Sequence, residues 1–373
     1  MLEYFFNTTQ FVIFTIAASS TLILLLYYIT LFRFKKTKSI DINFNQGISV
    51  IISAKNERKN LIENLPLILN QSYENFEVIV VNDGSYDGTK EILNEMALIH
   101  NNLKPVHLEI EEQYQKGKKF ALTIGIKAAK NEHLLFTDAD CKPKSNLWIK
   151  HMAREYTNND IILGVAPLNT KSNLLGSFVS YETFHTAIQY LGYAKQNKAY
   201  MGVGRNLGYK KSIFFKNKGF ASHQHIMSGD DDLFIQEVSS NKKIGICYTR
   251  ETLMYSNPPA SFGKWIKQKV RHMSTSSEYR FIYKLLLGFY SFSQILWFFS
   301  IIGFLLLYPN YWYLVIGFAL IKWLVQWIIF GKFALKISAK RIAYFLPVYD
   351  ILYTFYLILF GVIKPFAKPK TWN

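Results

Sequence analysis

Residues 76–100 read FEVIVVNDGSYDGTKEILNEMALIH, and this stretch decides the fold. Residues 76–81 form a short run of apolar and β-branched side chains, which is typical of a buried strand. The turn signal NDGS follows directly, and from residue 87 onward the apolar positions recur at helical spacing, with Asp87 placed to cap the helix. A strand, a tight turn and a helix in this order are the repeating unit of an α/β sheet.

The same unit recurs on both sides of this stretch. Apolar runs predict strands at residues 47–53, 106–110 and 133–137, and helical spacing predicts helices at 57–71 and 118–130. This alternation predicts an α/β fold with a doubly wound, mostly parallel sheet.

Long apolar segments flank the α/β region. Residues 10–32 carry no charge and are long enough to cross about 30 Å of hydrocarbon as a helix. About three further segments of suitable length occur near the other end, at 285–307, 311–330 and 342–363. We therefore expect an N-terminal anchor (10–32), a soluble domain (47–284), a C-terminal membrane region (285–363) and a basic tail (364–373).

Basic residues indicate how these segments are oriented. Lys and Arg mark the cytoplasmic side of a membrane, and a basic cluster follows the anchor at once: Arg33, Lys35, Lys36 and Lys38. We expect a multi-pass protein of the plasma or inner membrane with its soluble domain in the cytoplasm. Three C-terminal crossings would leave the tail outside, where we assign it, although its three lysines favour the inside. Segment 342–363, with Pro347 and Asp350, is alternatively re-entrant or interfacial.

Composition excludes several functional classes. The net charge of +17 is carried by residues that are spread out or that flank apolar segments, and no nucleic-acid-binding motif is present. Cys141 and Cys247 cannot build a disulfide framework or a CxxC metal site. The chain has no P-loop, and GVGRNLG (202–208) lacks the spacing of a dinucleotide fingerprint.

Carboxylates follow three of the predicted strands. Glu57 follows the first strand, Asp83 the second, and Asp138 and Asp140 the strand at 133–137. Each residue alone could be a helix-start, turn or capping residue. Because ligands of an open parallel sheet bind outside the carboxyl ends of its strands, three such ends with carboxylates predict a shared binding rim.

The tripeptide Asp138-Ala139-Asp140 predicts a metal site. In extended chain its two carboxylates point the same way, which suits a hard cation such as Mg²⁺ or Mn²⁺. Such an ion bridges phosphate oxygens and neutralises a departing diphosphate. Lysines in QKGKKFAL, at the start of the helix at 118–130, predict an anion site or, alternatively, a solvated basic loop: Lys116, Lys118 and Lys119.

Two later motifs carry further candidates. In SGDDDLF, the adjacent carboxylates Asp230, Asp231 and Asp232 repel one another, so burial would raise at least one pKa toward that of a general base. The alternative is a solvated acidic turn. In WIKQKVRH, Gln268 and Arg271 precede the membrane region, where Arg271 could bind phosphate or belong to a basic interfacial helix.

Taken in order, the motifs resemble those of family 2 glycosyltransferases of the GT-A fold, especially the membrane-bound branch with cellulose- and hyaluronan-synthase-like enzymes. The resemblance covers about residues 47–284 through SVIISAKNE, VIVVNDGSYDGT, KGKKFAL, FTDADC, GVGRNLGY, GDDDLF and QKVRH. It implies that Glu57 and Asp83 contact the nucleoside of a nucleotide-sugar donor. It also implies that Asp138 helps to hold the nucleotide and that Asp140 binds the metal.

The resemblance also gives roles to the later motifs. One aspartate of GDDDLF stands where the family has its catalytic carboxylate; Asp230 matches best by its distance to Leu233, and Asp231 remains open. Gln268 and Arg271 correspond to the family's QxxRW motif, but His272 replaces the tryptophan. In the polymer-making enzymes that aromatic residue helps to hold the acceptor end, so its replacement argues against processive synthesis.

We therefore predict inverting, metal-dependent transfer of one sugar to a lipid-linked or glycan acceptor, at a membrane and without nucleic acid. Three alternatives remain open. They are a processive polysaccharide synthase, a non-catalytic membrane scaffold with a degenerate transferase domain, and a transporter. The transporter is suggested by Lys322 and Asp350, which lie within apolar segments.

Overall fold

The structure is a computed structural model, and it describes residues 8–31, 44–109, 117–170, 173–226 and 228–364. Several predictions concern residues outside these ranges. They are the basic cluster at 33–38, Lys116 and most of the tail.

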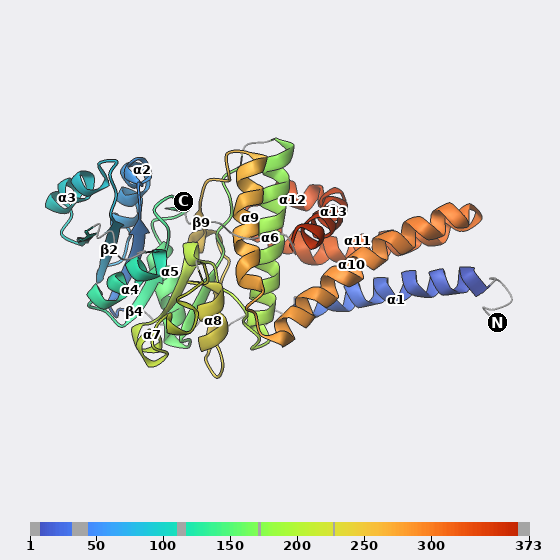
Figure 1. The fold of residues 1–373 in the computed structure, drawn as a ribbon, viewed down its shortest axis with the longest axis horizontal. Helices are drawn as coiled ribbons and strands as arrows, with labels where there is room; N and C mark the ends of the chain where they lie inside the picture. The colour runs from blue at the N-terminus through green and yellow to red at the C-terminus, as the bar shows by residue number, and fades with distance from the viewer. Residues whose placement is uncertain (1–7, 32–43, 110–116, 171–172, 227, 365–373) are drawn as a thin grey trace.

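A seven-stranded sheet forms the centre of the α/β domain (Figure 1), in the order β3-β2-β1-β4-β7-β6-β8. Neighbouring strands β3, β2, β1 and β4 are parallel, as are β6 and β8, whereas β7 runs antiparallel to both of its neighbours. The prediction of a mostly parallel sheet is therefore confirmed. The strands are β1 (Ile48–Ala54), β2 (Phe76–Asp83), β3 (Leu103–Leu108), β4 (His133–Phe136), β6 (Ile161–Gly164), β7 (Leu207–Lys210) and β8 (Ile244–Cys247).

Helices cover both faces of this sheet. Helix α4 (Lys118–Ala128) packs its apolar side against one face, through residues such as Ala121 and Ile126. Helices α2 (Arg58–Leu69), α3 (Thr89–Ile99) and α5 (Trp148–Arg154) pack on the other. Because β1 and β2 are covered on both sides, their sequences are continuous apolar runs rather than alternating ones.

Asp87 fixes the start of two helices at once. Its carboxylate accepts hydrogen bonds from the backbone N–H of Thr89 in α3, at 3.1 Å, and of Arg58 in α2, at 3.0 Å. The first N–H groups of a helix have no partner within the helix, so one carboxylate here satisfies two such ends. Asp87 therefore holds the loops after β1 and β2 together at the rim of the sheet.

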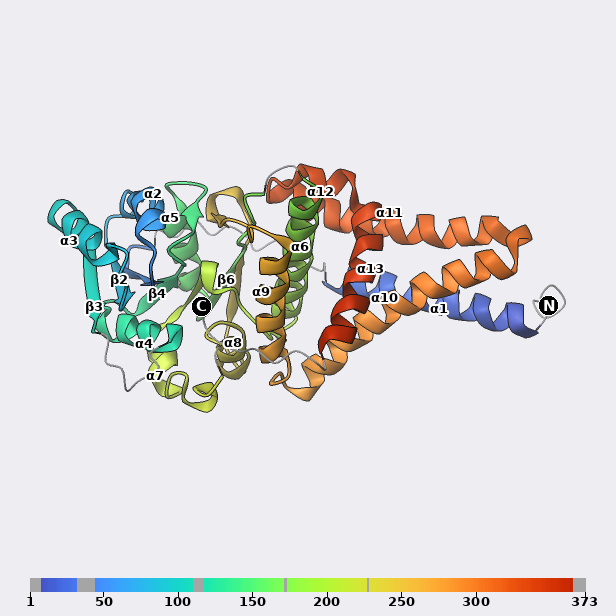
Figure 2. The same cartoon turned by 45° about the horizontal axis from the view of Figure 1, so that its top comes forward.

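Two helices stand between the sheet and the long apolar helices. Helices α6 (Leu174–Lys195) and α9 (Phe262–Ser276) lie side by side there in both views (Figures 1 and 2), and Lys269 of α9 forms a salt bridge with Glu182 of α6. A short two-stranded sheet, β5 (Lys142–Pro143) with β9 (Met254–Tyr255), precedes α9. The remaining short helices of the domain are α7 (Lys211–Lys216) and α8 (Asp232–Val238).

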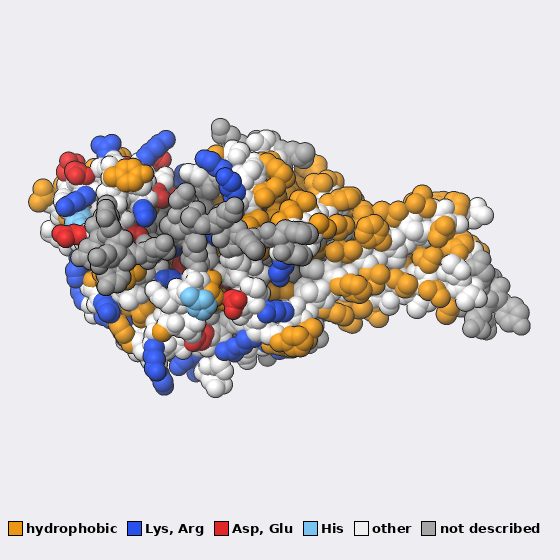
Figure 3. All heavy atoms as spheres, viewed as in Figure 1, with side chains coloured by type: hydrophobic (Ala, Val, Ile, Leu, Met, Phe, Trp, Pro, Cys, Tyr) orange, Lys and Arg blue, Asp and Glu red, His pale blue; other side chains and the backbone are white. Residues whose placement is uncertain are grey.

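Three long apolar helices project away from the α/β domain (Figure 2): α1 (Thr8–Leu31), α10 (Phe281–Leu307) and α11 (Trp312–Lys336). Hydrophobic side chains cover this projection, whereas Lys, Arg, Asp and Glu side chains gather on the α/β domain (Figure 3). Among the described residues, four helices are long and apolar enough to cross a membrane, and the fourth is α13 (Leu346–Ile363).

Helix α13 runs in a different direction from the other three. Figures 1 and 2 show its axis lying across those of α1, α10 and α11, and the short α12 (Lys340–Tyr344) precedes it. Its C-terminal end returns to the α/β domain, where the ring of Phe360 lies 5.6 Å from that of Trp265 in α9. We therefore propose that α13 lies along the membrane surface, which would place Lys364 on the side of the α/β domain. The tail that follows lies outside the described residues, so its assignment to the outside stays a prediction.

A buried ion pair attaches α13 to the bundle. Lys322 of α11 and Asp350 of α13 form a salt bridge in which both side chains are fully buried. Asp350 also accepts hydrogen bonds from Gln326 at 3.0 Å and from the indole of Trp323 at 3.2 Å. A carboxylate with this many partners is typical of an anchoring contact, so these two residues need no transport function to explain them.

Topology can be tested by labelling single cysteines in intact cells with a membrane-impermeant thiol reagent. Cys141 and Cys247 are buried and provide a silent background. We expect labelling at Asn310→Cys, in the exposed turn between α10 and α11, and protection at Ser240→Cys, on the surface of the α/β domain. Protection at Lys364→Cys supports an interfacial α13, whereas labelling there would mean that α13 crosses the membrane.

Candidate active site

All nine predicted site residues line one cavity, of about 1340 Å³, beneath the carboxyl ends of the strands. They are Glu57, Asp83, Lys118, Asp138, Asp140, Asp230, Asp231, Gln268 and Arg271. The residues come from both halves of the domain. The two that lie furthest apart in the sequence, Glu57 and Arg271, are separated by 214 positions.

Glu57 and Asp83, to which the resemblance gives a contact with the nucleoside, lie at one edge of the cavity. Glu57 begins α2 and accepts a hydrogen bond from the amide of Asn60 at 2.5 Å. Burial raises its pKa, and the nearby carboxylates of Asp140 and Asp138 raise it further. Asp83 is the last residue of β2 and is buried. Both side chains border the cavity.

Lys118 lies between the two acidic groups of the cavity. Its ammonium is 2.9 Å from a carboxylate oxygen of Asp138 and 3.2 Å from one of Asp230. Burial alone would lower the pKa of Lys118, but the surrounding aspartates raise it above its usual range. Burial opposes ionisation of Asp138 as well, yet Lys118 holds the pKa of that carboxyl below its usual range.

The neighbouring Lys119 does not belong to the anion site that the sequence predicted. Its ammonium is buried and donates hydrogen bonds to the backbone carbonyls of His223, at 2.6 Å, and Ile226, at 2.9 Å. Burial lowers its pKa to about 8. Consecutive residues of a helix point to different sides, so Lys119 points away from the cavity that Lys118 faces. It instead holds the segment that contains His223 and Ile226.

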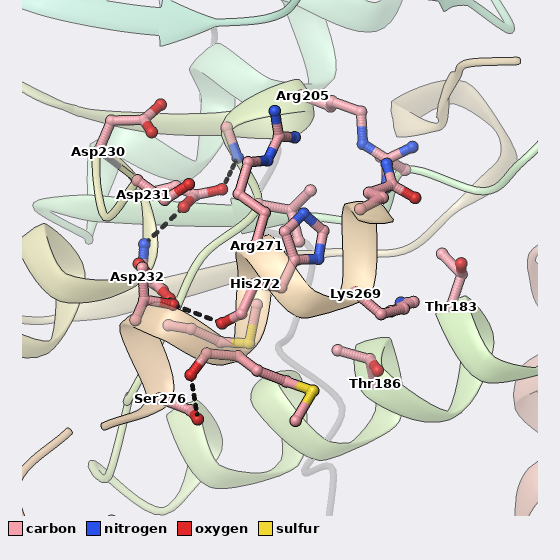
Figure 4. A pocket seen from close by; sticks show the side chains of 18 of the residues that line it. Thr183, Thr186, Arg205, Asp230, Asp231, Asp232, Lys269, Arg271, His272 and Ser276 are labelled. Atoms are coloured by element: carbon pink, nitrogen blue, oxygen red, sulfur yellow. Dashed lines mark hydrogen bonds between the residues drawn. The ribbon is translucent and has the colours of Figure 1, made fainter. Parts of the chain in front are cut away.

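The acidic cluster contains three different environments (Figure 4). Asp232 is buried and accepts hydrogen bonds from the hydroxyls of Thr275, at 2.5 Å, and Tyr279, at 2.8 Å. Asp230 faces Lys118. Asp231 lies between them, and its carboxylate accepts hydrogen bonds at 2.8 Å from the N–H groups of Gly204 and Asp232.

Asp231 has the titration expected of a general base. Burial raises the pKa of its carboxyl to about 7, and repulsion from Asp230 and Asp232 contributes. A base works best when its pKa lies near the working pH. Asp232 also has a raised pKa, through burial, but its hydroxyl partners from Thr275 and Tyr279 give it a structural role.

Helix α9 brings its motif to the opposite wall of the cavity. Gln268, Arg271 and His272 all border the space, and the Lys269–Glu182 salt bridge fixes the rotation of the helix. Burial, together with the cations of Lys269 and Arg271, lowers the pKa of His272 well below its usual range. These effects favour the neutral form of His272.

Arg205 is a site residue that sequence reasoning missed. It lies in the loop GVGRNLG before β7, projects into the pocket near Arg271 (Figure 4), and donates a hydrogen bond to Ser256. Arg205 and Arg271 both help to lower the pKa of Asp138. The signal that points to it is an arginine within a glycine-containing motif of the resemblance.

The carboxylates of Asp138 and Asp140 suit a metal ion that binds together with the phosphates of a substrate. Among the described residues, no three His, Cys, Asp or Glu side chains form a group that could hold an ion alone. Mg²⁺, however, is usually bound by one or two carboxylates plus substrate phosphates. The charge of Asp138 is balanced by Lys118, whereas burial and the charge of Asp138 raise the pKa of Asp140. A cation beside Asp140 would relieve that repulsion.

The chain is similar to known glycosyltransferases in sequence. Residues 49–216 match the family model described as glycosyl transferase family 2. Poly-beta-1,6-N-acetyl-D-glucosamine synthase of Staphylococcus epidermidis is 26% identical over 234 residues, which cover 61% of this chain and 53% of the relative. Glycosyltransferase AglE of Haloferax volcanii is 36% identical over 105 residues, 28% of this chain and 33% of the relative. The chain thus spans about half the length of the synthase that it matches.

The fold is similar to that of an enzyme of known structure. Mannosyltransferase PcManGT of Pyrobaculum calidifontis, in complex with GDP-Man and Mn²⁺, superposes with a TM-score of 0.55 at 17% identity. The match covers 92% of this chain and 99% of that chain. The predicted GT-A-type α/β fold with apolar helices at both ends is therefore confirmed.

The role of Asp140 can be tested by substitution and chelation. If Asp140 is a metal ligand, we expect Asp140→Asn to abolish sugar transfer without unfolding the chain, because the change removes that ligand and also relieves repulsion from Asp138. Thermal unfolding of the variant provides the folding control. Excess chelator should inhibit the unsubstituted chain, and full activity in chelator would contradict a metal at this position.

The acidic cluster predicts a separation of roles. We expect Asp230→Asn or Asp231→Asn to lower turnover by about 10² to 10⁴-fold, the usual contribution of a positioned base. Donor-nucleotide affinity should barely change, and Asp232→Asn should have a milder effect on turnover. Near-normal turnover in both of the first two variants would show that the base lies elsewhere.

The pH dependence distinguishes the two candidates. If Asp231 is the base, turnover should rise with pH through about 7, because its carboxylate must lose a proton before it can accept one. Below that pH the carboxyl is protonated and activity falls. Turnover measured across this range in the unsubstituted chain and in Asp230→Asn provides the check. An acidic limb far below pH 7 would contradict the assignment to Asp231.

Proposed function

We propose that this chain, whose residues 49–216 form a domain of glycosyl transferase family 2, is a membrane-bound inverting glycosyltransferase. It would transfer a sugar from a nucleotide-sugar donor to a lipid-linked or glycan acceptor. The observation that carries the proposal is the single cavity in which strand-end carboxylates, a lysine, an acidic cluster and two arginines face one another. A degenerate scaffold would have no reason to keep this set together.

The donor would lie along the strand ends. In this proposal Glu57 and Asp83 contact the nucleoside, and Asp138 with Lys118 holds the nucleotide. Asp140 would hold Mg²⁺ or Mn²⁺, which supplies positive charge to the diphosphate. Arginine binds phosphate through a planar fork of donors, so Arg205 and Arg271 suit the other side of the diphosphate, and both border the cavity.

Transfer would proceed by direct displacement. The acceptor hydroxyl attacks the anomeric carbon, its proton passes to Asp231 or Asp230, and the bond from the sugar to the nucleoside diphosphate breaks. The leaving diphosphate takes the electron pair, and its developing charge is stabilised by Arg271 and Lys118. A single displacement inverts the anomeric centre, so an α-linked donor would give a β-linked product.

A second candidate is a processive polysaccharide synthase. The similarity to poly-beta-1,6-N-acetyl-D-glucosamine synthase favours it. His272 disfavours it, because the family's polymer-making enzymes have an aromatic residue at that position of the QxxRW motif. Product size separates the two, since single transfer yields one product of fixed mass and processive synthesis yields a ladder.

The proposed location is the membrane, with the α/β domain on the cytoplasmic side. Four apolar helices and the basic residues around them support this orientation. A cytoplasmic domain would meet the nucleotide-sugar pool directly, and its acceptor would arrive from the membrane below.

A panel of nucleotide sugars tests the function. Membranes containing the chain should release free nucleoside diphosphate with one donor, and membranes containing an Asp230→Asn, Asp231→Asn double variant should not. The double variant is the matched control, because Asn has nearly the shape of Asp and the variant loses both candidate bases; thermal unfolding of its membranes shows whether it keeps the fold. If no donor gives release above this control, the chain is a scaffold rather than a transferase.

A further inference from the structure

Lys119 is a buried lysine whose charge the proposed transfer does not use. Its side chain is only 5% exposed and, unlike that of Lys118, does not border the cavity. Among the described residues its ammonium forms no salt bridge, and its hydrogen bonds go to the backbone carbonyls of His223 and Ile226, at 2.6 and 2.9 Å. Burying an ammonium against neutral partners costs free energy, so packing alone does not explain this lysine.

The held segment belongs to a loop that ends in the candidate bases. We call residues 222–226 and 228–232 the acidic loop; it ends with the three aspartates of the acidic cluster, where α8 starts. Its beginning is joined to α8, because the hydroxyl of Ser222 donates to the carboxylate of Glu237 at 2.7 Å and the imidazole of His223 lies 3.5 Å from that carboxylate. The acidic loop and α8 are thus tied to each other, and the buried ammonium attaches both to the first half of the domain.

A glycine makes the position of the candidate bases depend on the path of the acidic loop. Gly229 has a φ of +102°, in the left-handed region that favours glycine, and it directly precedes Asp230. A Cβ atom at this position would lie 2.6 Å from the side chain of Leu233. Because the chain turns sharply just before the acidic cluster, a shift of the preceding segment would move the carboxylates of Asp230 and Asp231.

Lys118 and Lys119 hold the acidic cluster in two different ways. Lys118 contacts the carboxylate of Asp230 at 3.2 Å and, on the proposed donor side, that of Asp138 at 2.9 Å. Lys119 instead binds the backbone that precedes the cluster. The two lysines begin α4, whose apolar side packs against the sheet. The acidic cluster is therefore positioned relative to the same strand ends along which the donor would lie.

The ammonium of Lys119 also acts on the acidic cluster through space. Burial lowers the pKa of Lys119, whereas the carboxylates of the cluster raise it. This attraction is mutual, so the ammonium favours the ionised form of the aspartates. A neutral side chain of similar length would lose both the hydrogen bonds to the acidic loop and this attraction.

We propose that Lys119 is a positioning residue for the catalytic base. By holding the acidic loop against α4, it sets the distance between the carboxylate of Asp230 or Asp231 and the donor held by Asp138 and Lys118. This proposal rests on the proposed transferase function and adds a residue to its site. Because a displacement of about 1 Å can cost about 10²-fold in rate, a lysine outside the cavity can control turnover.

Substitution of Lys119 tests the proposal against a matched lysine. Lys211 is the control, because its ammonium also binds a carbonyl from a distant segment, that of Ala129 at 2.6 Å, and does not border the cavity. We expect Lys119→Met to lower turnover by about 10-fold or more with donor-nucleotide affinity unchanged, whereas Lys211→Met should lower neither. Equal losses of turnover in the two variants, or a loss confined to nucleotide affinity, would overturn the proposal.

A more conservative variant guards against simple misfolding. Lys119→Gln keeps a hydrogen-bond donor for the two carbonyls and should retain more turnover than Lys119→Met. Thermal unfolding of both variants is compared with that of Lys211→Met, and where Lys119→Met does not fold, the comparison of turnover is made with Lys119→Gln. Turnover of Lys119→Gln equal to that of the unsubstituted chain, when Lys119→Met does not fold, would overturn the proposal.

A double-mutant cycle separates positioning from a general weakening of the fold. Lys119→Met is combined with whichever of Asp230→Asn and Asp231→Asn loses more turnover. We expect Lys119→Met to lower the remaining turnover by less than about 3-fold, because a base that is absent cannot be misplaced. The same fold-loss in both backgrounds would mean that Lys119 does not act through the base, and would overturn the proposal.

Hydrogen exchange tests the attachment itself without relying on activity. The full chain in nanodiscs is exchanged into deuterated buffer, and its peptides are measured by mass spectrometry. We expect Lys119→Met to raise exchange about 3-fold or more in 228–234 and to leave α6 unchanged, whereas Lys211→Met should change neither. Unchanged exchange in 228–234 would overturn the proposal. Raised exchange there, in a chain that releases no diphosphate from any donor, would locate the failure in the proposed transferase function rather than in the attachment.

Discussion

Lys118 is the contact on which the acidic site depends. It forms ion pairs with Asp138, from the first half of the domain, and with Asp230, from the second. Two like charges 4 Å apart repel by about 4 kcal/mol in a protein environment, and several carboxylates share this cavity. The ammonium offsets that repulsion and joins the two halves across the sheet. Because Lys118 is also the first residue of α4, the helix N-terminus adds positive potential at the same place, which suits a phosphate.

Much of this arrangement could be predicted from the sequence, because it depends on local pattern. Strands and helices of the first half follow from the spacing of apolar residues, and the carboxyl ends of parallel strands necessarily share one edge. That is why the sequence alone predicts that Glu57, Asp83 and Asp138 lie at one rim of the sheet. The roles of Lys119 and Arg205 could not be predicted, since they depend on contacts with segments about 50 to 100 residues away. The direction of α13 could not be predicted either, because the length and hydropathy of a segment carry no information about its orientation.

The acidic cluster also connects the chemistry to the membrane. Asp232 accepts hydrogen bonds from Thr275 near the end of α9 and from Tyr279 just before α10. Asp231 is its immediate neighbour and bonds to the N–H of Asp232. The position of the candidate base is therefore set by the segment that leads into the apolar helix α10. Residues that touch no substrate can in this way control how accurately the base meets the acceptor.

The buried pair of Lys322 and Asp350 has a geometric consequence. By fastening α13 to α11, it fixes the height of α9 above the apolar helices, because Phe360 of α13 packs against Trp265 of α9. A lipid held in the bilayer can present a hydroxyl to that height only if its headgroup is long enough to reach and short enough to fit. Under the proposed function, the chain would then select lipid-linked acceptors by how far they extend from the membrane, independently of which sugar they carry.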